Sequence, residues 1–184
     1  MHTEPAPSAE APSFAPSAPA SFRELYERHF PFTWRCLRHL GVPDAQLDDA
    51  VQEVWIAAHR RLAEFEGRAD IKTWLFSIAV NVQRNLYRSE RRWAGFVPLT
   101  PALVSPAADP SQEREGQEAW ALVQKFVGSL DEVRRAIFVG ALLEGLSPAE
   151  TAAATGLDVP TIYHRVRSLR RSFQLWADAH RSEP

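Results

Sequence analysis

Apolar residues recur at three- and four-residue intervals in two long blocks of the sequence, and this spacing restricts the fold more than any other feature. In "FRELYERHFPFTWRCLRHLG" they follow the period of an amphipathic helix that closes on Gly41. The period continues over residues 44–62 and 71–92 and resumes over residues 118–181. No stretch alternates apolar and polar residues as a half-buried strand does. The sequence therefore predicts an all-α protein, in which Pro31 is expected to kink the first helix or divide it into two.

Two segments lack this period and indicate how the chain is divided. Residues 1–20 are mostly Pro, Ala and Ser, too poor in apolar surface to offset their ordering entropy, so we predict a disordered tail. Residues 93–117 contain four prolines and exceed the usual length of a connection inside one domain. We interpret them as a flexible linker between two small helical domains, residues 21–92 and 118–181.

The formal net charge of −2 conceals a local excess of arginine. Basic residues concentrate in two runs, 84–92 and 165–171, and the second run contains no acidic residue. A locally basic helix matters more for binding a polyanion than the total charge does. The single cysteine excludes an internal disulfide and suits a reducing compartment. With no signal-peptide pattern and no apolar run near the roughly 18 residues of a spanning helix, we expect a cytoplasmic protein.

The sequence contains no pattern typical of catalysis. There is no Gly-rich phosphate loop and no catalytic constellation, so we expect neither an enzyme nor a small-molecule substrate or cofactor. Cys36 and His39 have the spacing of metal ligands, but no second pair lies near them in the sequence. We therefore predict no metal site and place Cys36 in the core.

The segment "LSPAETAAATGLDVPTIYHRVRSLRRSF" predicts a helix-turn-helix. Ser147 and Glu150 have the spacing of a capping box, and Gly156 is placed to end the short helix that they begin. A longer basic helix then starts near Pro160 and continues to about residue 177. This order of short helix, glycine turn and basic helix is typical of DNA-binding modules.

The longer helix has two different faces. Ile162, Val166, Leu169 and Phe173 fall on one stripe, which we predict to be the core face. The opposite face presents hydrogen-bond donors, an aromatic ring and several cations, which suit base edges and phosphates. The alternative is a solvated basic face on an ordinary helical hairpin. The capped helix and glycine turn in front of it favour DNA recognition.

The segment "WLFSIAVNVQRNLYRSERR" combines a packing stripe with a polar one. Asn81, Asn85, Arg88 and Arg92 recur at intervals of four, three and four residues and so share one helical face. An amide both donates and accepts hydrogen bonds and suits the edge of an unstacked base, while arginine holds phosphates. The alternative is that the asparagines only solvate the helix.

These segments resemble a known family. The helix-turn-helix segment resembles the fourth conserved region of bacterial RNA polymerase sigma factors of the extracytoplasmic-function (ECF) type. Upstream, "LDDAVQEVWIAAHRRL" and "FEGRADIKTWLFSIAVNVQRNLYRSERR" resemble the second conserved region of that family. The resemblance implies a promoter-specificity subunit that binds core RNA polymerase through the β′ clamp helices and the β flap. It also implies binding to promoter DNA and to an anti-sigma factor.

The resemblance also implies roles for single residues, which complete the two helical faces. The family usually has an arginine at the position of Val80, an aspartate at that of Asn85 and a proline at that of Asp131. Contact with the β′ clamp helices is expected of Asp49, Gln52 and Glu53. Contact with the opened −10 element is expected of Asn81, Arg84, Asn85, Arg88, Arg91 and Arg92. Contact with the −35 element is expected of Thr161, Tyr163, His164, Arg165, Arg167, Ser168 and Arg171.

A second function remains open on the sequence alone. The chain fits a stand-alone helix-turn-helix transcriptional regulator, with residues 22–92 serving for dimerisation or as an adaptor. The acidic face at Asp49, Gln52 and Glu53 separates the two hypotheses, because a stand-alone regulator does not require it.

Overall fold

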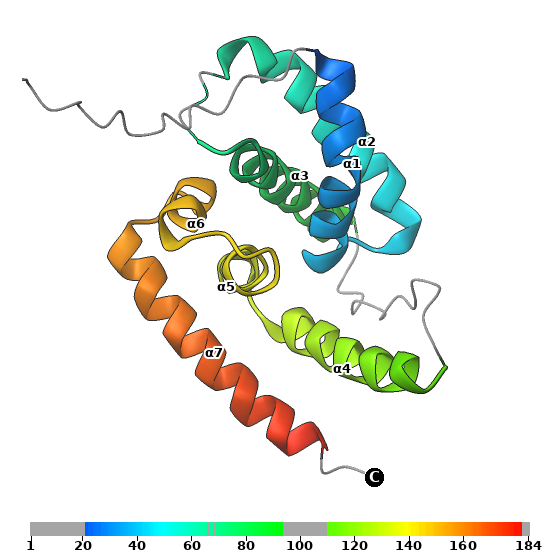
Figure 1. Cartoon of the computed structure of the whole chain (residues 1–184), viewed down its shortest axis with the longest axis vertical. Helices are drawn as coiled ribbons and strands as arrows, with labels where there is room; N and C mark the ends of the chain where they lie inside the picture. Colours follow the sequence, from blue (N-terminus) through cyan, green and yellow to red (C-terminus); the bar gives the residue numbers. More distant parts are fainter. Residues whose placement is uncertain (1–20, 66, 68, 94–109, 182–184) are drawn as a thin grey trace, which may run out of the picture.

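The computed structural model describes residues 21–65, 67, 69–93 and 110–181 of the chain, and every regular element among them is helical (Figure 1). The side chains of residues 89–93, 110–118 and 181 lie outside this description, as do the predicted tail and most of the predicted linker. The elements are α1 (Phe22–His39), α2 (Asp44–Arg61), η1 (Leu62–Glu64), α3 (Ile71–Trp93), α4 (Pro110–Ser129), α5 (Glu132–Phe138), η2 (Val139–Leu143), α6 (Pro148–Thr155) and α7 (Val159–Arg181).

The first three helices pack against one another and form the N-terminal module. Ser21 caps α1 by accepting a hydrogen bond from the backbone N–H of Glu24. Pro31 lies inside α1 without dividing it, since the element is one helix from Phe22 to His39. Leu25 before Pro31 and Leu37 after it are both buried, so packing holds the two halves of the helix in place despite the hydrogen bond that proline cannot donate.

Helices α4 to α7 form the C-terminal module. Phe126, Phe138 and Phe173 pack their rings against one another, with centroids 5.2–5.6 Å apart. The predicted capping box is confirmed, because Ser147 Oγ accepts from the N–H of Glu150 while the Glu150 carboxylate accepts from the N–H of Ser147. Gly156 ends α6 in the left-handed conformation at φ +74°.

One boundary of the C-terminal module differs from the expected one. Helix α4 begins at Pro110, inside the segment predicted as linker, and not at residue 118. Asp131 stands between α4 and α5 and caps α5, its carboxylate accepting from the N–H of Arg134 at 2.9 Å. The single helical turn after α5, η2, is a π-turn with an i→i−5 hydrogen bond from Glu144 N–H to the Val139 carbonyl.

The two modules touch each other, which was not expected from the sequence. Helix α3 packs against α6, and α1 contacts η2, so α3 lies between the remainder of the N-terminal module and the helix-turn-helix (Figure 1). All the buried apolar residues of the described part except Ala177 form one continuous cluster that runs from Leu25 in α1 to Leu169 in α7. The described part of the chain is therefore two helical units with a shared buried interface.

Candidate nucleic-acid interface

Helix α7 is positioned by a local cap at its first turn. The Asp158 carboxylate accepts two hydrogen bonds from Thr161, one from its backbone N–H at 2.8 Å and one from its hydroxyl at 2.7 Å. These bonds lower the pKa of Asp158. The hydroxyl of Thr161, one of the residues predicted to contact DNA, therefore uses its proton in capping the helix.

The two predicted faces of α7 are present. Ile162 is fully buried and Leu169 is 5% exposed, with Val166 and Phe173 partly buried on the same stripe. The prediction that these four residues form the core face of the helix is thus confirmed. On the opposite face Tyr163 is 62% exposed, so its ring is free to contact a ligand. The remaining predicted contacts on this face are the exposed His164, Arg167, Ser168 and Arg171 and the half-buried Arg165.

Helix α3 also presents the predicted polar stripe, with one difference. Asn81, Asn85 and Arg88 are exposed, so these side chains can reach a ligand. Arg84 is instead only 22% exposed and forms an ion pair with Glu132 of α5, in the other module. The guanidinium expected beside the asparagines is therefore held at the contact between modules. Backbone of α3 extends to Trp93, but the side chains of Arg91 and Arg92 lie outside the described part.

The polar face of α2 adjoins a cleft. Asp49, Gln52 and Glu53 are all exposed on one side of this helix. Beside them, between α1 and α2, lies a cleft of about 580 Å³. Gln52 lines the cleft together with several aromatic and aliphatic side chains, of which Tyr26 is 39% and Ile56 43% exposed. Such half-exposed apolar side chains next to a polar face are typical of protein contact sites.

The cleft was not expected from the sequence, although a signal for it was present in α2. Ile56 lies three and four residues after Glu53 and Gln52, so it continues their polar stripe along α2 with an apolar side chain. An isoleucine in that place is not explained by packing inside the module. One side of α2 therefore carries both the acidic face and, at Gln52 and Ile56, the rim of the cleft.

Metal clusters and membrane-spanning helices are both absent from the described residues. In that part of the chain no cluster of three or more His, Cys, Asp or Glu side chains is suited to hold a metal ion. None of the described helices is both long and apolar enough to span a membrane. Cys36 is a free thiol in the core, and burial raises its pKa well above the ordinary value.

Comparison with protein families identifies the N-terminal module. The model of "Sigma-70 region 2" matches residues 25–93, which include α2, α3 and the polar stripes on both helices. The chain is 29% identical to the RNA polymerase sigma factor CnrH of Cupriavidus metallidurans, over 86% of this chain and 87% of that protein. It is 30% identical to the sigma factor NccH of Alcaligenes xylosoxydans xylosoxydans, over 82% and 83% of the two chains.

A third relative is also a sigma factor, and two solved structures share the fold of this chain. The ECF RNA polymerase sigma factor RpoE of Cereibacter sphaeroides is 30% identical over 80% of this chain and 81% of its own length. CnrH, solved in complex with the cytosolic domain of CnrY, has a TM-score of 0.63 at 28% identity, covering 86% of this chain and 88% of CnrH. RpoE of Bartonella quintana, solved with the anti-sigma factor NepR, shares the fold, with a TM-score of 0.70 at 22% identity over 85% of this chain and 96% of that one.

Proposed function

The chain belongs to the extracytoplasmic-function family of RNA polymerase sigma factors, and we propose that it recruits core polymerase to promoters through three surfaces, on α7, α3 and α2. The observation that carries this proposal is the arrangement of α7, whose buried stripe faces the core while an aromatic ring and several cations face outward. We assign recognition of the −35 element to Tyr163, His164 and the arginines of this face. An arginine side chain contacts guanine edges with two hydrogen bonds and also neutralises phosphates.

We assign contact with the opened −10 element to α3. Asn81 and Asn85 are exposed side by side on a helix whose opposite side is buried, so their amides are held by a rigid element. An unstacked base offers donor and acceptor atoms that an amide can match, and Arg88 lies one turn away to hold a phosphate. We extend the same assignment to Arg91 and Arg92, whose side chains lie outside the described part of the chain.

We assign contact with core polymerase to α2. The exposed Asp49, Gln52 and Glu53 offer charge and hydrogen bonds to the β′ clamp helices, and the adjoining cleft offers an apolar surface for the same partner. A polar rim around an apolar centre is typical of protein interfaces. From the family membership we also infer that the C-terminal module contacts the β flap. A stand-alone regulator would have no use for this face, and the family membership does not favour that alternative.

The remaining assignments follow from the family. The related CnrH has been solved with the cytosolic domain of CnrY, and we infer that an anti-sigma factor holds this chain too. We also infer that the protein acts in the cytoplasm as a binding subunit, without catalysis, cofactor or small-molecule substrate.

Co-elution with core RNA polymerase in gel filtration tests the proposal. The double variant Asp49→Arg, Glu53→Arg should lose co-elution, because it places two cations where the clamp helices are expected. The matched control is Glu27→Arg, Glu64→Arg, which makes the same change of net charge at two other exposed carboxylates and should co-elute normally. Unchanged co-elution of the first variant would contradict the assignment of α2, and failure of the native chain to bind polymerase would favour the stand-alone regulator.

A further inference from the structure

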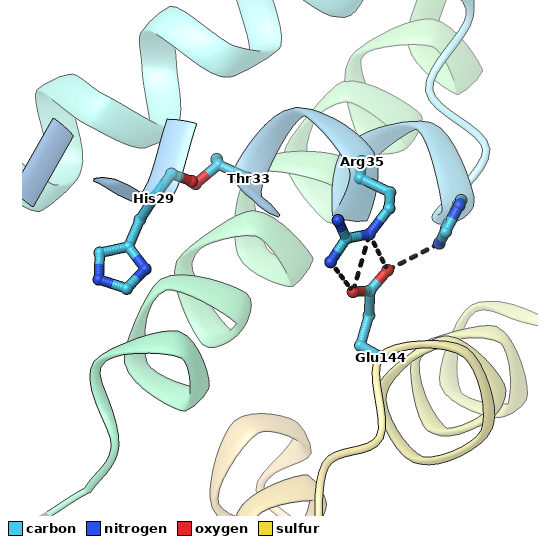
Figure 2. Close-up of polar contacts among 5 residues, drawn as sticks. His29, Thr33, Arg35 and Glu144 are labelled. Atoms are coloured by element: carbon cyan, nitrogen blue, oxygen red, sulfur yellow. Dashed lines mark hydrogen bonds and ion pairs between the residues drawn. The ribbon is translucent and has the colours of Figure 1, made fainter. Parts of the chain in front are cut away.

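Helix α1 has one side that is already engaged and one that is not. On the engaged side Arg35 Nη2 donates to the Glu144 carboxylate at 2.9 Å, and Nδ1 of His39 lies 2.7 Å from the other oxygen of that carboxylate (Figure 2). Burial raises the pKa of Glu144, but the hydrogen bonds from His39 and Arg35 outweigh burial and the pKa is lowered. This side of α1 is therefore a satisfied contact with the C-terminal module, whereas the side at the cleft with α2 keeps Tyr26 exposed.

The cleft between α1 and α2 is lined by a row of aromatic rings from both helices. Each ring contacts the next, with centroids 4.8–5.9 Å apart. In order along the cleft, the rings belong to His59, Phe22, Trp55, Tyr26 and Phe30. Grooves lined with aromatic rings are the surfaces on which proline-rich segments dock in the polyproline II conformation. The cleft therefore has the chemistry of a proline-binding groove.

One ring of this row has an unused hydrogen-bond donor. Trp55 is only 4% exposed, and its indole Nε1 is buried without a hydrogen-bond partner among the described residues. A buried indole N–H ordinarily has an acceptor. The polyproline II backbone forms no internal hydrogen bonds, so its carbonyls are available to accept one. A proline-rich chain seated on Trp55 would supply the acceptor that this donor lacks.

A segment of this composition directly precedes the cleft in the sequence. Residues 11–20, "APSFAPSAPA", contain three prolines, one aromatic residue and no charged residue. Pro16 and Pro19 have the PxxP spacing, which places both on one edge of a polyproline II helix with three residues per turn. The segment ends at the N-cap of α1, and the first residue of that helix, Phe22, lines the cleft. The proline-rich segment and the aromatic groove are therefore adjacent in the chain.

The segment is also long enough to cover the cleft. Phe22 and Phe30 are the first and last residues of α1 that line it, and they lie about 12 Å apart along the helix axis. In polyproline II the chain from Phe14 to Pro19 extends about 16 Å, which leaves the residues between Pro19 and α1 to reverse its direction. Because the connection is so short, the segment is present at the cleft at an effective concentration on the order of millimolar. Weak contacts therefore suffice for binding.

We propose that residues 11–20 dock in the polyproline II conformation across the aromatic row of the cleft, with their prolines against the rings and a backbone carbonyl accepting from Trp55 Nε1. The docked segment contacts Gln52 and Ile56, which line the cleft beside the face assigned to core polymerase. The protein thus carries its own competitor for that partner. This consequence rests on the proposed function, whereas the docking itself does not.

NMR of the full chain labelled with ¹⁵N tests the docking without polymerase. The indole N–H signal of Trp55 is identified by its absence from Trp55→Phe. In the variant Pro16→Gly, Pro19→Gly this signal should shift, because the segment loses its polyproline II preference and the N–H loses its acceptor. The matched control Pro5→Gly, Pro7→Gly makes the same change outside the segment and should leave the signal at its native position. An unmoved signal in both variants, or an equal shift in both, would overturn the docking.

A peptide distinguishes the occupants of the cleft. A synthetic peptide of residues 11–20, added in excess to the Pro16→Gly, Pro19→Gly protein, should return the Trp55 signal to its native position, and a peptide carrying the same two glycines should not. Failure of the native peptide would overturn the docking. In the native chain the Trp55 signal should not depend on protein concentration. A signal that moved on dilution would place the segment of a second copy in the cleft and overturn docking within one chain.

Affinity for core polymerase tests the competition. The full chain with Pro16→Gly, Pro19→Gly should bind core polymerase several-fold more tightly than the control with Pro5→Gly, Pro7→Gly, because its cleft is open. Equal affinities would overturn the role of the segment as a competitor. If the Trp55 signal responds as expected but no form of the protein binds polymerase, the docking stands and the proposed function fails.

Discussion

Arg135 donates a hydrogen bond to the hydroxyl of Tyr87 at 2.7 Å and places its guanidinium 5.1 Å from the centre of the same ring. The same side chain donates to the backbone carbonyls of Val127 and Leu130, which end α4 in its own module. One buried cation therefore satisfies the end of one helix and joins it to another module. Arg135 therefore stabilises its own module and also fixes the position of that module against α3.

Replacement of Arg135 by methionine should destabilise the protein by about 2–4 kcal/mol, because several buried carbonyls and the Tyr87 hydroxyl lose their partner. Arg134→Met is the matched control, since Arg134 is exposed and its ion pair with Asp131 is on the surface. That control should change stability by less than about 0.5 kcal/mol. Urea unfolding followed by circular dichroism measures both, and equal midpoints would contradict the role of Arg135.

Acid should weaken the contact at Glu144. Because the pKa of this carboxyl is lowered in the folded protein, its contribution to stability is fully present above the ordinary value of 4.5 and is lost as the pH falls through the lowered one. The Glu144→Gln variant lacks this titration. The difference in unfolding free energy between the native chain and Glu144→Gln should therefore shrink as the pH falls from about 5 through the lowered pKa. If the difference in unfolding free energy instead grew towards acid pH, the lowered pKa of Glu144 would be contradicted.

The basic face of α7 should make DNA binding sensitive to salt. If Arg165, Arg167, Arg170 and Arg171 each neutralise a phosphate, the logarithm of the affinity for a duplex carrying the −35 element should fall with the logarithm of salt concentration at a slope of about −3.6. Each Arg→Gln substitution should reduce the magnitude of that slope by about 0.9. Fluorescence anisotropy at several salt concentrations measures it, and a flat response would exclude the phosphate contacts.

Asn81 should act at the opening step and not in duplex binding. Asn81→Ala is expected to reduce the yield of open complexes with core polymerase roughly tenfold, the effect of losing about one hydrogen bond to a base. Since the side chain is exposed, the melting temperature should not change, and affinity for the −35 duplex should be that of the native chain. Permanganate footprinting reports the opened bases. A normal footprint in the variant would remove Asn81 from the −10 surface.

Local patterns in the sequence predicted the helices, the caps and the faces of α7. The capping box of Ser147 and Glu150 and the left-handed Gly156 depend on residues within one turn of each other, and spacing alone reveals them. The stripe of Ile162 and Leu169 likewise follows from the helical period. The start of α4 was missed because Pro110 sits at its first position, where proline is compatible with a helix, and the prolines before it suggested a longer linker.

The contact between the modules was not predictable by the same means. Arg35 and His39 are polar residues that appear solvated on α1, and nothing in their neighbourhood points to Glu144. One signal did exist in α3, where "WLFSIAV" is apolar on nearly all sides. A helix of that kind is buried on more than one face, and Phe76 and Val80 form its second packing surface.

Arg35 and Glu144 are 109 positions apart in the chain, which matters while the protein is being made. At 5–20 residues per second, the ribosome adds Glu144 on the order of ten seconds after Arg35. During that interval the N-terminal module has been made, but the C-terminal helices that pack against α3 have not. The newborn chain therefore passes, in every round of translation, through a form in which the side of α3 that packs on Gly140 is exposed to water.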